Sequence, residues 1–363
     1  MILVLPLAVL GLVWWFVIRP STKRRSHTRP DDADRVVAPT APAVRHPTLV
    51  VGPPVVAAVV EMIGVSKAYG SGDRRHLALD HLDLAVPEGG VFGLLGQNGA
   101  GKTTALRCLM GLISPTSGTC RILGADSGPG LHRVINRVGA FIETPGLAPT
   151  LSGRRNLALL ARLDRIGESA VERALREAGL EDRADDPVAT YSLGMRQRLG
   201  IATALLRDPE VVILDEPANG LDPAGIAEIR HLLISLARDG RTVIVSSHLL
   251  DEVEKTCDRV AVIDAGRCVA VGPIGDVLAT AGAGTLLVGV ADLGAAQHAL
   301  AAAGIDSTVT DGALRVRCAP RHAAHVTEIL AAEQLFVSEL RHERPTLEAV
   351  FFGLTSSGAA QDR

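Results

Sequence analysis

Aromatic residues are scarce in this chain, at 3% of 363 residues, and this limits what it can bind. Proteins that hold single-stranded nucleic acid stack successive bases on aromatic side chains, so a base-stacking platform is disfavoured. A surplus of basic residues is missing too, because 37 Lys and Arg stand against 40 Asp and Glu, for a net charge of −3. Nucleic-acid binders usually carry a basic field. We therefore expect no nucleic-acid partner.

Cysteine pairs with metal-binding spacing are also missing. The chain has five cysteines, with no CxxC and no CxxxH among them: Cys108, Cys120, Cys257, Cys268 and Cys318. Scattered cysteines of this kind are typical of reduced thiols in a cytosolic protein. The pattern disfavours a disulfide framework and a zinc site.

The first 18 residues, MILVLPLAVLGLVWWFVI, contain no charged side chain. A run of this length is a candidate membrane span, and Trp14 and Trp15 lie toward its basic end, as residues of an interface belt do. Positive charge begins at Arg19, after the run, so we predict a transmembrane anchor over residues 1–19 with the rest of the chain on the cytoplasmic side. A cleaved signal peptide would carry its charge before the run. With its tail IRPSTKRR, the segment resembles the anchor of the small translocase subunit YajC; the alternative is that translation starts at Met62.

The remainder of the chain divides by composition into segments of different character. Residues 20–56 are rich in Pro, charged and small residues, which predicts a disordered linker. Strands then alternate with helical patterns over residues 57–285, which predicts an α/β domain with a parallel sheet and a helical section over about 140–207. Residues 286–355 alternate in shorter strands and helices, as in a small accessory α+β domain, and residues 356–363 read as a frayed tail.

Three short apolar runs predict buried strands: VFGLL at 91–95, VVILDEP at 211–217 and TVIVSSH at 242–248. LSGRRNLALLARL has apolar positions at helical spacing, and Ser152 is placed to cap the start of that helix. ESAVERALREAGL repeats the spacing and ends at Gly179, a natural C-terminal stop.

The segment GQNGAGKT, residues 96–103, fits the phosphate-loop pattern G-x-x-x-x-G-K-[ST] at every fixed position, with a buried strand before it and a helix after it. Glycines let the backbone wrap closely and aim its amides at phosphate, while the helix start adds partial positive charge. We expect Lys102 to reach the β- and γ-phosphates and Thr103 to ligate Mg²⁺. The predicted contacts of this loop with a nucleotide are Gly96, Gln97, Asn98, Gly99, Ala100, Gly101, Lys102, Thr103 and Thr104.

Two adjacent carboxylates, Asp215 and Glu216, end the run VVILDEP. In open α/β sheets, ligands bind at the carboxyl ends of the strands. Asp215 is placed to hold Mg²⁺ as a Walker-B aspartate does, and Glu216 to polarise a water molecule as a general base. Together with the phosphate loop, this pair predicts a nucleoside triphosphatase. Kinases, GTPases and motor ATPases share both motifs, so these residues alone leave the superfamily open.

The stretch YSLGMRQRLG, residues 191–200, lies just upstream of the Asp-Glu strand and resembles the LSGGQ-type signature of ABC ATPases. Ser192 and Gly194 match that signature, whereas Leu193 and Met195 depart from it. Arg196 stands where glutamine is common.

Further motifs of the ABC ATPases follow in register. Tyr69, in KAYG, matches the aromatic residue that stacks on adenine, and Asp222, in NGLDP, the acidic residue of the D-loop. His248, in SSHLLDEVE, matches the switch histidine that senses the γ-phosphate. Glu143, in GAFIETPG, replaces the usual glutamine of the Q-loop and could still ligate Mg²⁺ as a hard oxygen donor; IETP is similar to the bacitracin- and lantibiotic-immunity branch. The end, PTLEAVFFGLT, resembles the C-terminal extension of export ATPases.

The resemblance implies a P-loop NTPase fold, with the helical section as a signature subdomain of an ABC ATPase domain. It implies ATP and Mg²⁺ as cofactors, Lys102, Glu216 and His248 as catalytic residues, and a head-to-tail dimer in which Ser192 and Gly194 of one copy close over the ATP of the other. The partner is a second copy or a related ATPase. A separate multi-span permease at the cytoplasmic face of the cell membrane would carry a drug, peptide antibiotic or lipid-like cargo outward.

Other readings of the same motifs remain open at this point. An ABC protein of translation or DNA repair usually has two ATPase domains in one chain or a long coiled-coil insertion, and this sequence has neither. A small-molecule kinase with a phosphate loop would lack the signature and the switch histidine. A catalytically silent regulatory subunit would be expected to have lost some of the catalytic side chains that are present here.

Overall fold

The computed structural model describes residues 49–51, 57–70, 75–142, 146–280, 284–310, 312–318, 322–343 and 346–359. The predicted anchor, most of the predicted linker and Glu143 lie outside these residues. Within the described part of the chain, no helix is both long and apolar enough to cross a membrane.

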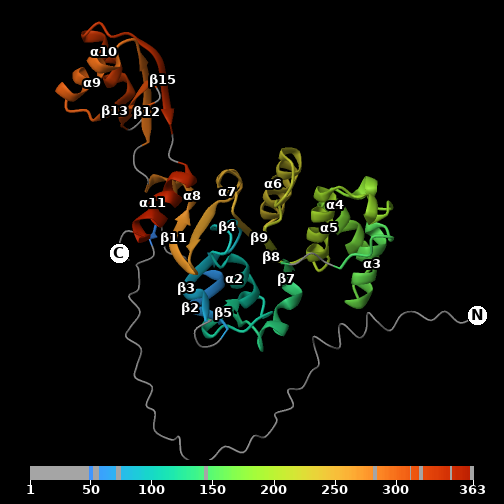
Figure 1. Cartoon of the computed structure of the whole chain (residues 1–363). Coiled ribbons are helices and arrows are strands. Elements are labelled where there is room, and N and C mark those ends of the chain that lie inside the picture. The colour runs from blue at the N-terminus through green and yellow to red at the C-terminus, as the bar shows by residue number, and fades with distance from the viewer. Residues whose placement is uncertain are drawn as a thin grey trace, which may run out of the picture. The chain divides into compact units, whose positions relative to one another are not determined.

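The largest sheet among the described residues has seven strands (Figure 1). Strands β10, β4, β9, β8 and β7 run parallel, and β11 joins β10 in the antiparallel direction. Strand β1, which lies within the predicted linker, adds to β11 at the edge. In spatial order the strands are β1 (Leu49–Val50), β11 (Arg267–Pro273), β10 (Arg259–Asp264), β4 (Gly90–Leu95), β9 (Thr242–Ser247), β8 (Val211–Asp215) and β7 (Val138–Phe141).

Alternate residues of the central strands pack into two different cores. On β4, Val91 and Leu95 face a core that includes α5 (Leu193–Leu205) and α6 (Pro223–Arg238). Phe92 and Leu94 face the other core, which includes α2 (Lys102–Leu109) and a second sheet. Because both faces are covered, these strands read in the sequence as continuous apolar runs, as predicted for β4, β8 and β9.

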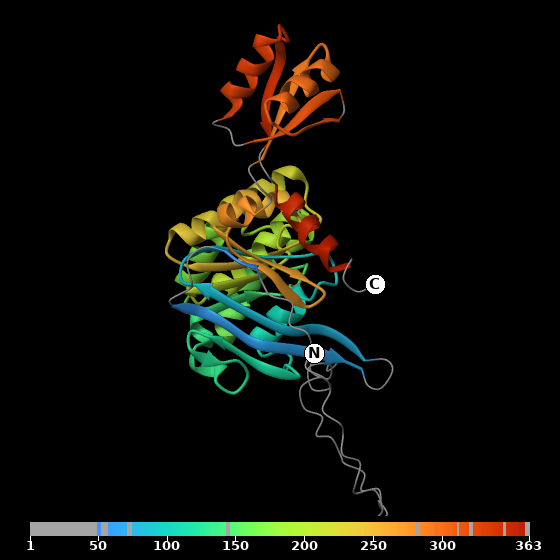
Figure 2. The ribbon, with the colours of Figure 1, turned by 90° about the vertical axis from the view of Figure 1, so that its left-hand side faces the viewer.

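The second sheet is antiparallel, in the order β3-β2-β5-β6, and its long ribbon stands out in Figure 2. From the sequence, VVEMIGVSKAY and HLALDHLDLAV both look like edge strands. For β2 this is wrong, because it pairs with β3 on one side and with β5 on the other. Met62 lies in the middle of β2 and is 2% exposed, and a chain starting there would lack the fully buried Val60. The strands are β2 (Ala58–Tyr69), β3 (His76–Pro87), β5 (Ser117–Ile122) and β6 (Ala125–Asp126).

Two helices precede α5 in the helical section, and their ends agree with the sequence. Helix α3 (Gly153–Leu163) is capped by Ser152, whose hydroxyl accepts a hydrogen bond from the N–H of Arg155. Helix α4 (Glu168–Glu177) is followed by Gly179 at φ 62°, in the left-handed conformation that ends helices. Both caps were predicted.

The segment after α8 (Ile274–Ala279) folds around its own core. Its four-stranded sheet has the order β13-β14-β12-β15, and the sequence of elements is β-α-β-β-α-β, as in ferredoxin-like domains. The sequence did not reveal β13, a short and mostly exposed strand. The elements are β12 (Thr285–Val290), α9 (Leu293–Ala302), β13 (Ser307–Thr310), β14 (Ala313–Arg317), α10 (Ala323–Ala332) and β15 (Val337–Glu343).

The last helix, α11 (Leu347–Ala359), differs from the prediction of an accessory domain ending at 355 and a tail beyond it. Leu347, Val350 and Phe351 join the core that contains α7 (Leu250–Thr256) and α8. The N–H of Leu347 donates to the Glu254 carboxylate of α7 over 3.2 Å. The apolar face of α11 is therefore part of the larger domain.

Candidate active site

The parallel strands bring their carboxyl ends to one edge of the sheet. Leu95 of β4 lies level with Ser247 of β9, and Ser246 lies level with Asp215 of β8. The residues that follow these strand ends are therefore neighbours in space, although Asp215 and Ser246 are 31 positions apart in the chain and Leu95 and Ser247 are 152 apart. This edge carries the phosphate loop, the Asp-Glu pair and His248.

Two glycines of the loop are required by close approach of the backbone. A Cβ at Gly96 would lie 2.4 Å from the carbonyl oxygen of Ile263. Gly101 has φ 109°, and a Cβ there would lie 2.6 Å from the carbonyl oxygen of Ala78. Gly101 is also the N-cap of α2, and no side chain among the described residues caps that helix. The first N–H groups of α2 thus point forward without a side-chain partner, which makes this helix start a site for an anion.

The remaining loop residues line the approach to that helix start. Gln97, Asn98 and Gly99 are exposed, whereas Ala100 is buried, with its carbonyl oxygen accepting from the N–H of Gly266 over 2.9 Å. Thr103 and Thr104, in the first turn of α2, are partly exposed.

Lys102 is a buried cation, 5% exposed, at the centre of the site. Its Nζ donates to the carbonyl oxygens of Gly96 at 2.7 Å and Gln97 at 3.2 Å. The same Nζ lies 3.1 Å from Oε1 of Glu216, and Oε2 of Glu216 lies 2.8 Å from Nδ1 of His248. The structure thus brings the three predicted catalytic side chains into one connected chain of contacts.

Asp215 is held from two sides. The hydroxyl of Thr103 donates to its Oδ2 over 2.7 Å, and the hydroxyl of Ser246 donates to its Oδ1. The Ser246 hydroxyl also accepts from the N–H of Glu216 over 2.9 Å. Sequence reasoning missed Ser246; the signal that could have found it is a hydroxyl residue at the end of an otherwise apolar strand, next to the Asp-Glu strand.

The oxygen donors at this edge fit a magnesium ion. Mg²⁺ is usually held by one or two carboxylates together with phosphate oxygens and water, rather than by a complete protein cage. Asp215 and Thr103 offer a carboxylate and a hydroxyl 2.7 Å apart. Among the described residues, no three His, Cys, Asp or Glu side chains gather into a cage for a metal ion. Glu143, the third predicted ligand, lies outside the described residues.

The signature residues lie at a different place from the phosphate loop of the same chain. Ser192 is the N-cap of α5, where its hydroxyl accepts from the N–H of Met195 over 3.2 Å, and Gly194 lies in the first turn. Asp222 caps α6 in the same way, accepting from the N–H of Gly225 over 3.0 Å. In Figure 1, α5 and α2 stand apart, with strands of the central sheet between them. The structure does not bring Ser192 or Gly194 to Lys102.

Tyr69 ends strand β2 and presents an aromatic ring that is 40% exposed. The Nζ of Lys67 lies 5.3 Å from the centre of this ring, within the range of a cation–π contact. The exposed ring is the kind of surface on which a nucleobase stacks.

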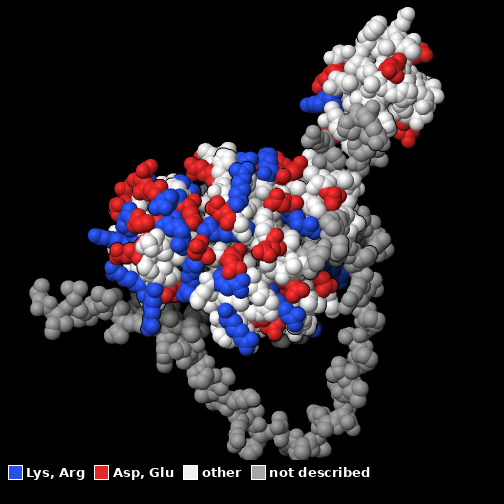
Figure 3. All heavy atoms as spheres, turned by 180° about the vertical axis from the view of Figure 1, so that it is seen from behind, with Lys and Arg blue, Asp and Glu red and all other residues white. Residues whose placement is uncertain are grey.

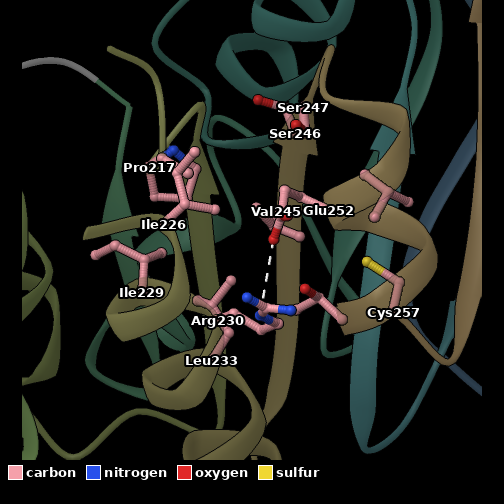
Figure 4. Close-up of a pocket in the computed structure, with 13 residues that line it drawn as sticks. Pro217, Ile226, Ile229, Arg230, Leu233, Val245, Ser246, Ser247, Glu252 and Cys257 are labelled. Carbon is pink, nitrogen blue, oxygen red and sulfur yellow. Dashed lines mark ion pairs between the residues drawn. The ribbon is translucent and has the colours of Figure 1, made fainter. Parts of the chain in front are cut away.

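A pocket lies between α6, α7 and β9 (Figure 4). Its walls are mainly apolar, and its charged residues Arg230 and Glu252 pair with each other at 3.7 Å. Burial raises the pKa of the Cys257 thiol on this wall to about 12, which keeps the thiol protonated and unreactive.

Charges on the face seen in Figure 3 are mixed, with Lys and Arg interspersed among Asp and Glu. A field of one sign, which would draw in a polyanion, does not develop on that face.

Comparisons with known proteins agree on the kind of domain. A family model described as ABC transporter matches residues 79–219. The bacitracin transport ATP-binding protein of Enterococcus faecalis is 37% identical over 304 residues, which cover 83% of this chain and 97% of that protein. The daunorubicin resistance ATP-binding protein of Streptomyces coeruleorubidus is 36% identical over 80% of this chain and 94% of its own length.

Solved structures resemble the larger domain. A dimeric ATP-binding cassette in a post-hydrolysis state with bound ADP and Pi has a TM-score of 0.53 and 26% identity, over 59% of this chain and 98% of that one. An ABC transporter subunit of Clostridium perfringens has a TM-score of 0.55 and 29% identity, over 61% of this chain and 91% of that one.

Proposed function

This chain belongs to the ATP-binding subunits of ABC transporters and is an ATPase, and we propose that it is the motor of an exporter, working as a dimer on a separate membrane permease. The observation that carries the catalytic part is the chain of contacts from Lys102 through Glu216 to His248, next to the Asp215–Thr103 pair. A regulatory subunit without activity would have no need of this arrangement.

Each of these side chains has a task in the proposed hydrolysis of ATP. Lys102 neutralises the β- and γ-phosphates, which replace Glu216 as the partner of its charge. Glu216, released from that pair, takes a proton from the attacking water. His248, which contacts the other oxygen of Glu216, holds the carboxylate in place and senses the γ-phosphate. Asp215 and Thr103 would hold Mg²⁺, which would neutralise charge that develops on the phosphate oxygens.

The proposed dimer is head to tail, with two ATP molecules in a symmetric interface. The separation of α5 from α2 supports this arrangement, because Ser192 and Gly194 would then contact the ATP of the other copy. The hydroxyl of Ser192 accepts a bond within α5 and, like any hydroxyl, can still donate one to a phosphate oxygen. Asp222, at the start of α6, would lie at the same interface. ATP binding would favour the closed dimer and hydrolysis the open one.

The relatives support export as the direction of transport, since their names specify bacitracin transport, daunorubicin resistance and lantibiotic transport. We therefore propose a peptide antibiotic, drug or lipid-like molecule as the cargo and the cytoplasmic face of the membrane as the location. The predicted anchor over residues 1–19 would keep the ATPase beside its permease and raise their effective concentration.

The experiment that tests the transport proposal is affinity purification of the full-length chain from gently solubilised membranes, followed by mass spectrometry. We expect a protein with several membrane spans in near-equal amount. Recovery with ribosomes, with nucleic acid or alone would contradict the transport proposal and favour a non-transport ABC protein.

A further inference from the structure

Ser246 is the last residue but one of the buried strand β9, and its side chain is 0% exposed. Its Oγ lies between two groups of the active site, because it donates to Oδ1 of Asp215 and accepts from the backbone N–H of Glu216. One hydroxyl therefore uses both its donor and its acceptor capacity on the Asp-Glu pair.

We propose that Ser246 is a positioning residue for ATP hydrolysis, which fixes the Asp215 carboxylate and the Glu216 backbone at once; this inference rests on the proposed roles of those two residues. Oδ2 of Asp215 is held by Thr103, so the bond from Ser246 to Oδ1 leaves the carboxylate a single orientation. Both bonds act on the residues proposed to hold Mg²⁺ and to activate water.

The backbone of Glu216 shows why such a support is needed. Its φ of 48° lies in the left-handed region, which is disfavoured for a residue with a side chain. The N–H of Glu216 is directed at Ser246 rather than along a strand ladder. Without the hydroxyl, this partly buried N–H would lose its partner, and the backbone that directs the Glu216 carboxylate toward Lys102 and His248 would be less firmly held.

The test compares Ser246→Ala with Ser247→Ala, a matched control one residue further along the chain. The hydroxyl of Ser247 accepts from the N–H of Leu249 over 3.0 Å, so it is engaged away from the Asp-Glu pair. Both variants would be purified as full chains and checked by thermal melting. Their affinity for a fluorescent ATP analogue would be measured in EDTA and in Mg²⁺, together with the rate of hydrolysis as a function of Mg²⁺ concentration.

For Ser246→Ala we expect metal-free nucleotide affinity within about twofold of the unchanged protein, because the phosphate loop is intact. The Mg²⁺ concentration for half-maximal hydrolysis should rise, and kcat should fall, by roughly tenfold or more, the effect of losing a hydrogen bond to a charged group. Ser247→Ala should leave both values unchanged. Ser246→Thr, which keeps the hydroxyl, should recover most of the loss.

Three results would overturn the proposal. The first is an unchanged Mg²⁺ dependence and kcat in Ser246→Ala. The second is a loss of nucleotide affinity in EDTA as large as the loss in Mg²⁺, which would indicate general damage to the site. The third applies if Ser246→Ala does not fold and Ser246→Cys, whose thiol is a weak donor, behaves as the unchanged protein does. The unsubstituted protein is the control for the proposed function. If it failed to hydrolyse ATP, the proposed function would be wrong, whatever the result for Ser246.

The contribution of Asp215 is isolated by a double-mutant cycle. In an Asp215→Asn background, removing the Ser246 hydroxyl should change the Mg²⁺ dependence by much less than in the unchanged protein. Full additivity of the two substitutions would show that Ser246 does not act through Asp215.

Discussion

Lys102 is the most enclosed of the three proposed catalytic side chains, at 5% exposure against 19% for Glu216 and 29% for His248. A buried ammonium without partners is costly, and here two carbonyl oxygens and one carboxylate surround it. The cation is therefore held ready for phosphate oxygens, which can take the place of the carboxylate.

Replacing Lys102 by Ala should weaken ATP binding by roughly ten- to a hundredfold, because charge-assisted hydrogen bonds to the phosphates are lost. Titration with a fluorescent ATP analogue measures this loss. Lys255→Ala is the matched control, since that lysine is 53% exposed on α7 and pairs with Glu252. Equal affinity in Lys102→Ala and the unchanged protein would remove Lys102 from the binding of phosphate.

For single residues, the sequence predicts which ones form the active site better than it predicts which side chains contact one another. The fixed spacing of GQNGAGKT identifies Lys102 and Thr103, because the loop is continuous in the chain. The contacts of Ser246 with Asp215 and Glu216 depend on the register between β8 and β9, which no local pattern specifies. The roles assigned to the site residues, from Tyr69 and Lys102 to Asp222 and His248, remain predictions.

Helices α2 and α5 begin differently, one without a side-chain cap and one with a serine cap. Helix α2 begins at Gly101 without a side-chain cap among the described residues, which leaves its first N–H groups for an anion. Helix α5 begins at Ser192, which caps it internally and stabilises the helix by about 1 kcal/mol. The first arrangement suits phosphates of the chain's own nucleotide, and the second suits a surface presented to another copy.

Helix α11 gives a prediction about stability. Phe351 is 3% exposed in the core with α7 and α8, whereas its neighbour Phe352 is 52% exposed. Phe351→Ala should lower the free energy of unfolding by about 3–5 kcal/mol through lost burial and a cavity, and Phe352→Ala by about 0.5 kcal/mol or less. Urea unfolding of both full-length variants, followed by circular dichroism, measures the difference. Equal, small shifts would show that α11 is not part of the core.

Among the elements, the strands buried on both faces and the capped helices of the ATPase were predictable, because apolar runs and cap residues are local signals. The packing of α11 on α7 was not, because it joins Phe351 to residues such as Val253, nearly a hundred positions earlier. The separate antiparallel sheet was hidden for a similar reason, since β2 and β5 pair across the whole phosphate loop and α2.

The molecule as a whole has one phosphate loop and one signature, placed apart from each other. In the proposed account each is half of a composite site that only a second copy completes. The described residues form the ATPase. We propose that the cargo passes through another polypeptide. ATP then has two roles, as the substrate and as the bridge between copies.

The dimer claim is tested most directly by sedimentation velocity of the Glu216→Gln variant with and without ATP and Mg²⁺. The amide keeps the size of the carboxylate but cannot take the proton of water, so hydrolysis should slow by about a hundredfold or more while ATP stays bound. Adding Ser192→Arg to this variant, to block the facing signature, should abolish dimerisation and leave nucleotide binding by the monomer intact. We predict a monomer without nucleotide and a stable dimer with ATP and Mg²⁺. A monomer at saturating ATP, or a dimer that survives Ser192→Arg, would contradict it.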